Sequence, residues 1–64
     1  MNIYEQVSSV CAEQGITYSS MPEPQLIDKL YEICLALGYD RKSVKWWFNY
    51  NHDFVPDLLE YVPK

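Results

Sequence analysis

Histidine, glycine and basic residues are scarce in this chain of 64 residues. His52 is the one histidine, and no nearby serine or cysteine is indicated that it could activate as a nucleophile. Gly15 and Gly38 are the two glycines, and both follow helical patterns, so the sequence contains no glycine-rich phosphate loop. A chain this short also has few residues with which to enclose a pocket of about 300–1,000 Å³. These absences favour a protein that is not an enzyme and holds no cofactor.

Cysteine is equally sparse, with Cys11 and Cys34 each inside an apolar helical stripe. Two cysteines cannot build the multiple disulfides of a small secreted protein, so we predict reduced core residues. A single disulfide is the alternative. A shared metal site is a weaker one, because His52 lies at no ligand-like spacing from either thiol.

Long apolar runs are absent, and none approaches the roughly 20 residues of a membrane span. The opening MNIYEQ has no basic segment before an apolar core, so it does not resemble a signal peptide. We therefore expect a cytoplasmic protein, or a nuclear one in a eukaryote, without a membrane partner.

Positive charge is limited to five residues against nine acidic ones, which gives a net charge of −4 and a pI near 4.6. This balance argues against general affinity for nucleic acid and favours a basic or apolar protein partner. The charge is uneven, however, because residues 41–45 form a basic island. The island is either a binding surface or an ordinary solvated helix face.

What the chain has in abundance is apolar and aromatic side chains, at 48% and 16% of the residues. Helical periodicity runs through the chain without any long β-alternation, so we predict a single all-α domain spanning residues 1–64. The expected helices cover roughly residues 3–14, 24–37, 41–50 and 54–62. Between the first two, residues 16–24 are rich in serine and proline and predict an irregular loop. The second helix is apolar over more than half its circumference, and we expect the other three to contact it.

Cap residues mark the helix ends. Asn2, Asp40 and Asp53 are predicted N-caps. Gly15 and Gly38 follow helix ends, where a positive φ is favourable. After Gly38, Tyr39 is expected to fold back against the preceding helix.

Residues 41–50 carry the most distinctive pattern. Residues spaced at i, i+3, i+4 and i+7 lie on one face of this helix, which we expect to be buried. The opposite face carries basic and aromatic side chains. Successive residues differ by about 100°, so the two adjacent tryptophans cannot share one buried face, and Trp46 is the one assigned outward. The alternative is that Trp46 covers the first or last helix. The inward set is Val44, Trp47, Phe48 and Asn51, and the outward set is Arg41, Lys42, Lys45, Trp46 and Asn49.

From Leu37 to Val62 the chain resembles a ubiquitin-associated (UBA) domain, a three-helix fold that binds ubiquitin or other proteins. Leu37-Gly38-Tyr39 stands where the family has Met-Gly-Phe or Met-Gly-Tyr, and residues 51–54 and 58–62 resemble its second turn and last helix. The resemblance implies an apolar partner-binding patch. Its members would be Leu37, Gly38, Tyr39, Leu59 and Val62.

The same turn also resembles a phage-repressor helix-turn-helix, with Gly38 before a recognition helix. Cys34, Tyr39, Val44 and Trp47 match its spacing. This resemblance implies a DNA-binding regulator, in which Arg41, Lys42, Ser43, Lys45 and Asn49 would face DNA.

Together these patterns predict a small regulatory module that binds a larger protein as an adaptor or inhibitor, with DNA binding as the alternative. The first helix would brace a UBA-like unit. The identity of the partner and the oligomeric state are left open by the sequence.

Overall fold

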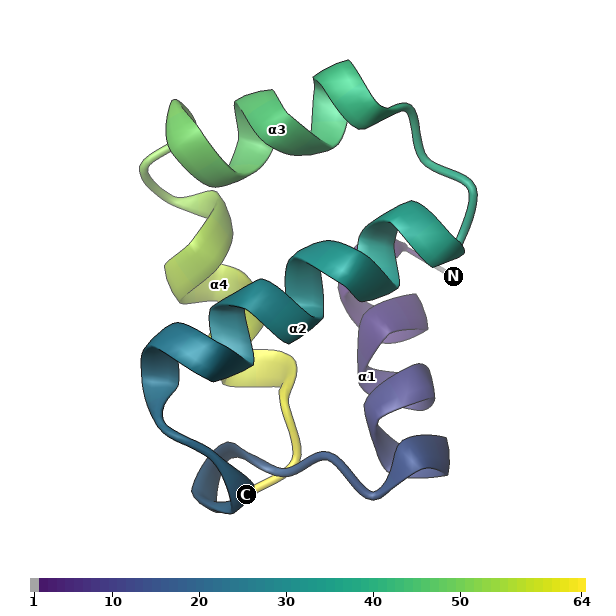
Figure 1. Cartoon of the computed structure of the whole chain (residues 1–64), viewed down its shortest axis with the longest axis vertical. Helices are drawn as coiled ribbons and strands as arrows, with labels where there is room; N and C mark the ends of the chain where they lie inside the picture. Colours follow the sequence, from purple (N-terminus) through teal and green to yellow (C-terminus); the bar gives the residue numbers. More distant parts are fainter. Residues whose placement is uncertain (1) are drawn as a thin grey trace.

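Four α-helices and a short 3₁₀ helix follow one another along the chain, and residues 2–64, which the computed structural model describes, contain no β-strand (Figure 1). The elements are α1 (Ile3–Gln14), η1 (Tyr18–Ser20), α2 (Glu23–Ala36), α3 (Arg41–Asn49) and α4 (Phe54–Tyr61). The all-α prediction is confirmed, and each predicted helix boundary lies within one residue of the observed one.

Two of the three predicted N-caps form as expected. The Glu5 N–H donates to Asn2 Oδ1 at 2.9 Å, and the Ser43 N–H donates to Asp40 Oδ2 at 3.1 Å. Both glycines that follow helices have positive φ, +71° at Gly15 and +97° at Gly38. Local signals therefore set the start of α1 and α3 and the turns after α1 and α2.

The third predicted cap is wrong. Asp53 has αR backbone angles, and its carboxylate accepts no capping hydrogen bond. An N-cap residue normally has an extended backbone, which directs its side chain to the free N–H groups of the first turn. Asp53 instead donates its N–H to Asn51 Oδ1 at 3.2 Å, so the Asn51 side chain organises this turn.

The loop between α1 and α2 is more regular than its composition predicts. The Thr17 N–H donates to Ser20 Oγ, and the Ser20 hydroxyl donates to the Thr17 carbonyl, which closes the turn of η1. The Tyr18 N–H donates to the Pro63 carbonyl at 2.7 Å. The loop is therefore joined to the last residues of the chain.

The helices pack as a closed ring. α1 packs against α2 and α4, and α3 packs against the same two helices (Figure 1). We expected α2 to be the central element, but each helix has two main neighbours. α1 is an integral part of this ring, since Val7 and Cys11 are completely buried.

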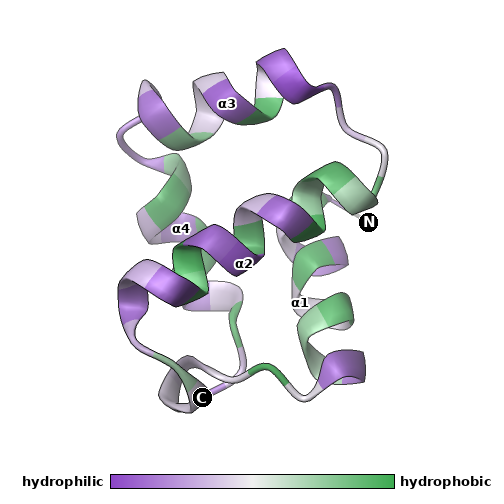
Figure 2. Cartoon of the chain, in the orientation of Figure 1, coloured by the Kyte–Doolittle hydropathy of each residue, from purple (hydrophilic) through white to green (hydrophobic). Residues whose placement is uncertain are grey.

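The core lies inside this ring, and Figure 2 shows the hydrophilic residues of α3 mainly on the side away from α2. Phe54, at the start of α4, is 4% exposed and contacts three other rings. Its ring centroid lies 5.6 Å from Tyr4, 5.4 Å from Trp47 and 5.3 Å from Phe48. Phe48 in turn lies edge-on to Tyr31 of α2 at 5.2 Å, so one aromatic chain joins all four helices. The buried residues are Val7, Cys11, Ile16, Leu26, Leu30, Ile33, Cys34, Val44, Phe54, Leu58 and Val62.

Replacing the central ring should destabilise the protein severely. We expect Phe54→Ala to lower the free energy of unfolding by about 3–5 kcal/mol, because it leaves a cavity at the meeting point of α1, α3 and α4. Urea unfolding followed by circular dichroism measures this loss. Tyr50→Ala, which removes an aromatic side chain that is 67% exposed, should change stability by less than about 0.5 kcal/mol. Equal losses in the two variants would contradict the central role of Phe54.

The two aspartates before α3 and α4 should differ in the same assay. Asp40→Ala should cost about 1 kcal/mol, because the Ser43 N–H loses its capping partner. Asp53→Ala should cost only a few tenths of a kcal/mol, from the charge near the helix dipole. A loss at Asp53 as large as that at Asp40 would show that its carboxylate caps α4.

Candidate functional site

The two adjacent tryptophans of α3 have opposite environments. Trp47 is half-buried, with Tyr39 edge-on at 5.6 Å and Phe54 at 5.4 Å. Trp46 is 54% exposed. Val44 is fully buried on the inward side of the same helix. The prediction that one indole is exposed is confirmed, and it is Trp46.

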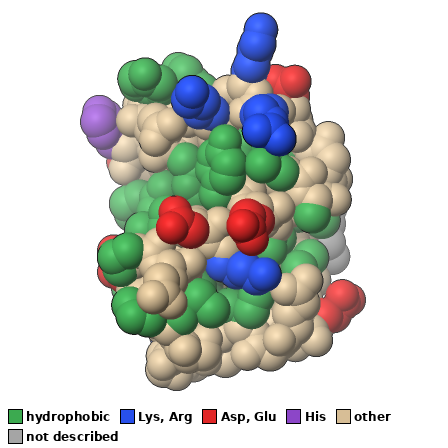
Figure 3. All heavy atoms as spheres, in the orientation of Figure 1, with side chains coloured by type: hydrophobic (Ala, Val, Ile, Leu, Met, Phe, Trp, Pro, Cys, Tyr) green, Lys and Arg blue, Asp and Glu red, His purple; other side chains and the backbone are tan. Residues whose placement is uncertain are grey.

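Three cations lie on the same helix as this tryptophan. Arg41, Lys42 and Lys45 are all exposed. Within residues 2–64 the one ion pair closer than 4 Å is that of Lys29 with Glu32, so the cations of α3 have no acidic partner there. Figure 3 shows most of the Lys and Arg side chains visible on this face at the α3 end of the molecule, and another beside the acidic side chains farther down.

Tyr50, 67% exposed, was not among the predicted site residues. Its signal in the sequence is its position four residues after Trp46, which places both rings on one side of the helix. We call the surface formed by Arg41, Lys42, Lys45, Trp46, Asn49 and Tyr50 the α3 outer face.

The turn before α3 is only partly available. Leu37 is 36% exposed and Gly38 is exposed, but Tyr39 is half-buried. The Tyr39 hydroxyl donates to Gln6 Oε1 on α1, and its ring packs on Trp47. Tyr39 therefore joins α1 to α3, whereas we expected it to fold back on α2.

The predicted residues of α4 do not form an open patch with this turn. Leu59 is half-buried, and Val62 is only 2% exposed because it closes the core beside the loop that follows α1. Val62 is therefore not on the surface. Tyr61, which was not predicted, is 43% exposed and stacks on Tyr4 of α1 at 5.2 Å. α1 thus links the turn to α4, through Gln6 on one side and Tyr4 on the other.

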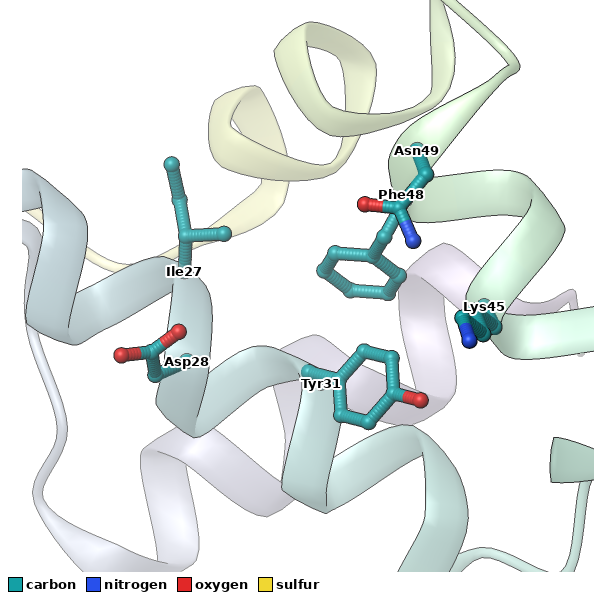
Figure 4. Close-up of a pocket in the computed structure, with 6 residues that line it drawn as sticks. All are labelled: Ile27, Asp28, Tyr31, Lys45, Phe48 and Asn49. Carbon is teal, nitrogen blue, oxygen red and sulfur yellow. The ribbon is translucent and has the colours of Figure 1, made fainter.

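A groove lies between α2 and α3 (Figure 4). Its volume is about 310 Å³. We call it the α2–α3 groove. Only its α3 side was partly predicted, since its residues come from two helices whose relative position depends on the fold. Its lining is Ile27, Asp28, Tyr31, Lys45, Phe48 and Asn49.

The nucleophilic and metal-ligating side chains are not gathered into a site. Both cysteines are free and fully buried, as expected for core residues. Burial raises the pKa of Cys34 to about 11, with a further contribution from Cys11. Because the thiolate is the reactive form, both thiols are poor nucleophiles. His52 is exposed in the turn before α4, and residues 2–64 contain no group of three or more His, Cys, Asp or Glu side chains placed to hold a metal ion.

Comparisons of the chain with protein-family models, with curated protein sequences and with solved structures find no match. The resemblances to UBA domains and to helix-turn-helix regulators therefore remain predictions. Over residues 2–64, the longest helix, α2, has 14 residues, and no helix is long and apolar enough to cross a membrane.

The buried thiols predict a loss of stability at alkaline pH. The pKa of Cys34 is raised from an ordinary value of 9.0 to about 11, so the folded protein holds this proton after the unfolded chain has released it. The free energy of unfolding should therefore fall as pH rises from about 9 to about 11. Urea unfolding at several pH values across this range measures the decline. Cys34→Ala should show a smaller decline, and equal declines would contradict the assignment.

Proposed function

We propose that this protein is a non-enzymatic regulatory module that binds a larger protein, as an adaptor or an inhibitor, through the α3 outer face. The observation that carries the proposal is the exposure of Trp46, at 54%, and of Tyr50, at 67%, on a helix whose three cations have no acidic partner within residues 2–64. Tryptophan, tyrosine and arginine are the residues most enriched among binding hot spots.

The two rings suit the centre of an interface. An aromatic side chain offers about 150–250 Å² of contact area, and it has only two rotatable χ angles to immobilise. Trp46 lies in α3, and Tyr50 is the residue that ends this helix, four positions and about one helical turn later. A partner with an apolar pocket would gain contact area here at a low entropic cost.

The charge pattern indicates what should surround that pocket. The protein as a whole carries a net charge of −4, whereas the α3 outer face carries three cations and no carboxylate. An acidic partner surface is therefore attracted to this face and repelled by the rest of the molecule, which favours one binding orientation. We propose that the partner presents acidic residues around an apolar pocket, and not the basic surface that the net charge of the whole chain favours.

The turn before α3 supports a wider contact. Leu37 and Gly38 are exposed directly before the outer face, and they are the residues that the UBA resemblance nominates. We propose that they lie at the edge of the interface. Leu59 is half-buried, and it is an auxiliary contact at most.

Removing the exposed indole should weaken binding to the partner strongly without unfolding the protein. The immobilised protein and its Trp46→Ala variant are incubated with an extract of the source cells, and a protein retained by the first alone is purified. Its affinity for Trp46→Ala, measured by calorimetry, should be weaker by about 2 kcal/mol or more. Tyr61→Ala, which removes an exposed ring from α4, is the matched control and should bind normally. Equal binding of the wild type and Trp46→Ala would refute the role of this face.

A gel-shift assay separates this function from DNA binding. We expect no retention of duplex DNA at about 50–200 mM salt, because the net charge is negative and Trp46 occupies the middle of the face. Salt-sensitive retention that is lost in both Lys42→Glu and Lys45→Glu would instead establish the helix-turn-helix alternative.

A further inference from the structure

The α2–α3 groove has an apolar floor between two rims of opposite charge. Ile27, Tyr31 and Phe48 form the floor, with Tyr31 and Phe48 edge to face at 5.2 Å. Asp28 lies on the α2 rim and Lys45 on the α3 rim. Figure 3 shows basic side chains on one side of an apolar band and acidic side chains on the other, with a further basic side chain beside the acidic ones. Asp28 and Lys45 do not pair with each other across the groove, since Lys29 with Glu32 is the ion pair found in residues 2–64.

A second pair of charges lies level with the first. Glu32 is one helical turn beyond Asp28 toward the end of α2, and Arg41 is one turn before Lys45 toward the start of α3. The short turn at residues 37–40 joins these two ends, and α2 and α3 run in roughly opposite directions (Figure 1). Asp28 and Glu32 therefore lie opposite Lys45 and Arg41, and Lys29, which pairs with Glu32 at 3.9 Å, lies on the α2 side as well. All four side chains are exposed.

This arrangement is complementary to itself. In a two-fold dimer both copies use the same surface, and the symmetry axis lies in the interface. If residue i of one copy contacts residue j of the other, residue j of the first copy contacts residue i of the second. If the axis runs along the groove, rotation exchanges its two sides. The acidic rim of one copy then faces the basic rim of the other, and the two apolar floors face each other. A partner of unrelated sequence would not require the charges to be matched across the groove in this way.

We propose that this chain forms a symmetric homodimer through the α2–α3 groove, with Asp28 of each copy opposite Lys45 of the other and Glu32 opposite Arg41. The dimer does not depend on the proposed function, but it uses Arg41 and Lys45 of the α3 outer face, which leaves Lys42, Trp46 and Tyr50 of that face for another partner. Trp46 follows Lys45 by one residue, about 100° around α3, so its ring points away from the groove. The dimer would present two copies of Trp46 and Tyr50 to other proteins.

Charge reversal provides the test. Sedimentation equilibrium of the full chain, from about 1 µM to about 1 mM, should show a monomer–dimer equilibrium. Lys45→Asp and Asp28→Lys each place two like-charged pairs in the interface, and each should raise the dimer Kd by roughly tenfold or more. An equimolar mixture of these two variants should form a heterodimer, because both pairs then have opposite charges. The double variant Asp28→Lys/Lys45→Asp should form a homodimer again.

Matched controls separate these pairs from the effect of total charge. Lys64→Asp and Glu13→Lys make the same changes in charge away from the groove and should leave the dimer Kd nearly unchanged. Asp28→Lys lowers the net negative charge, so general repulsion alone would strengthen its dimer, whereas the proposed pairs require it to weaken. Circular dichroism checks that each variant is folded. A wild type that stays monomeric throughout, or a mixture of the two variants that does not associate, would overturn the proposal.

Discussion

The packing of Phe54 against three other aromatic rings is the interaction on which the rest of the structure depends. Phe54 begins α4, yet its ring contacts Tyr4 of α1 and both Trp47 and Phe48 of α3. α2 joins this chain of rings where Tyr31 meets Phe48. In a protein of this length only about 60% of the unfolded chain's surface can be buried, so large side chains must supply much of the core. One ring that contacts several helices sets their relative positions with few residues.

This cluster also decides what the surface presents. Trp47 and Phe48 both pack against Phe54, and this contact fixes the rotation of α3 about its own axis. Helical geometry then directs Trp46 and Tyr50 to solvent. The exposed aromatic rings are therefore a consequence of how α3 is anchored. Asp40 contributes by starting the helix at Arg41, which keeps the basic residues within its first two turns.

α3 takes part in both surfaces that we associate with binding. Its outer side carries Trp46 and Tyr50, whereas its inner edge supplies the basic rim of the α2–α3 groove. The remaining helices position it. α1 holds the turn before α3 through Tyr39 and Gln6, and Tyr4 of the same helix packs on Phe54 and Tyr61. Of the residues that the UBA resemblance nominates, Tyr39 is the one that α1 holds, through Gln6.

Local patterns in the sequence determined the four helices, the caps at Asn2 and Asp40 and the turns at Gly15 and Gly38, because each depends on neighbours within about two helical turns. Only the tertiary structure decided the features that join distant segments. Val62 is buried next to Pro63, whose carbonyl accepts from the Tyr18 N–H of the loop after α1, and Tyr39 is bonded to Gln6 of α1. Asp53 fails as a cap because the Asn51 side chain and the position of Phe54 set its backbone. The α2–α3 groove likewise depends on how two helices are placed, which no local pattern specifies.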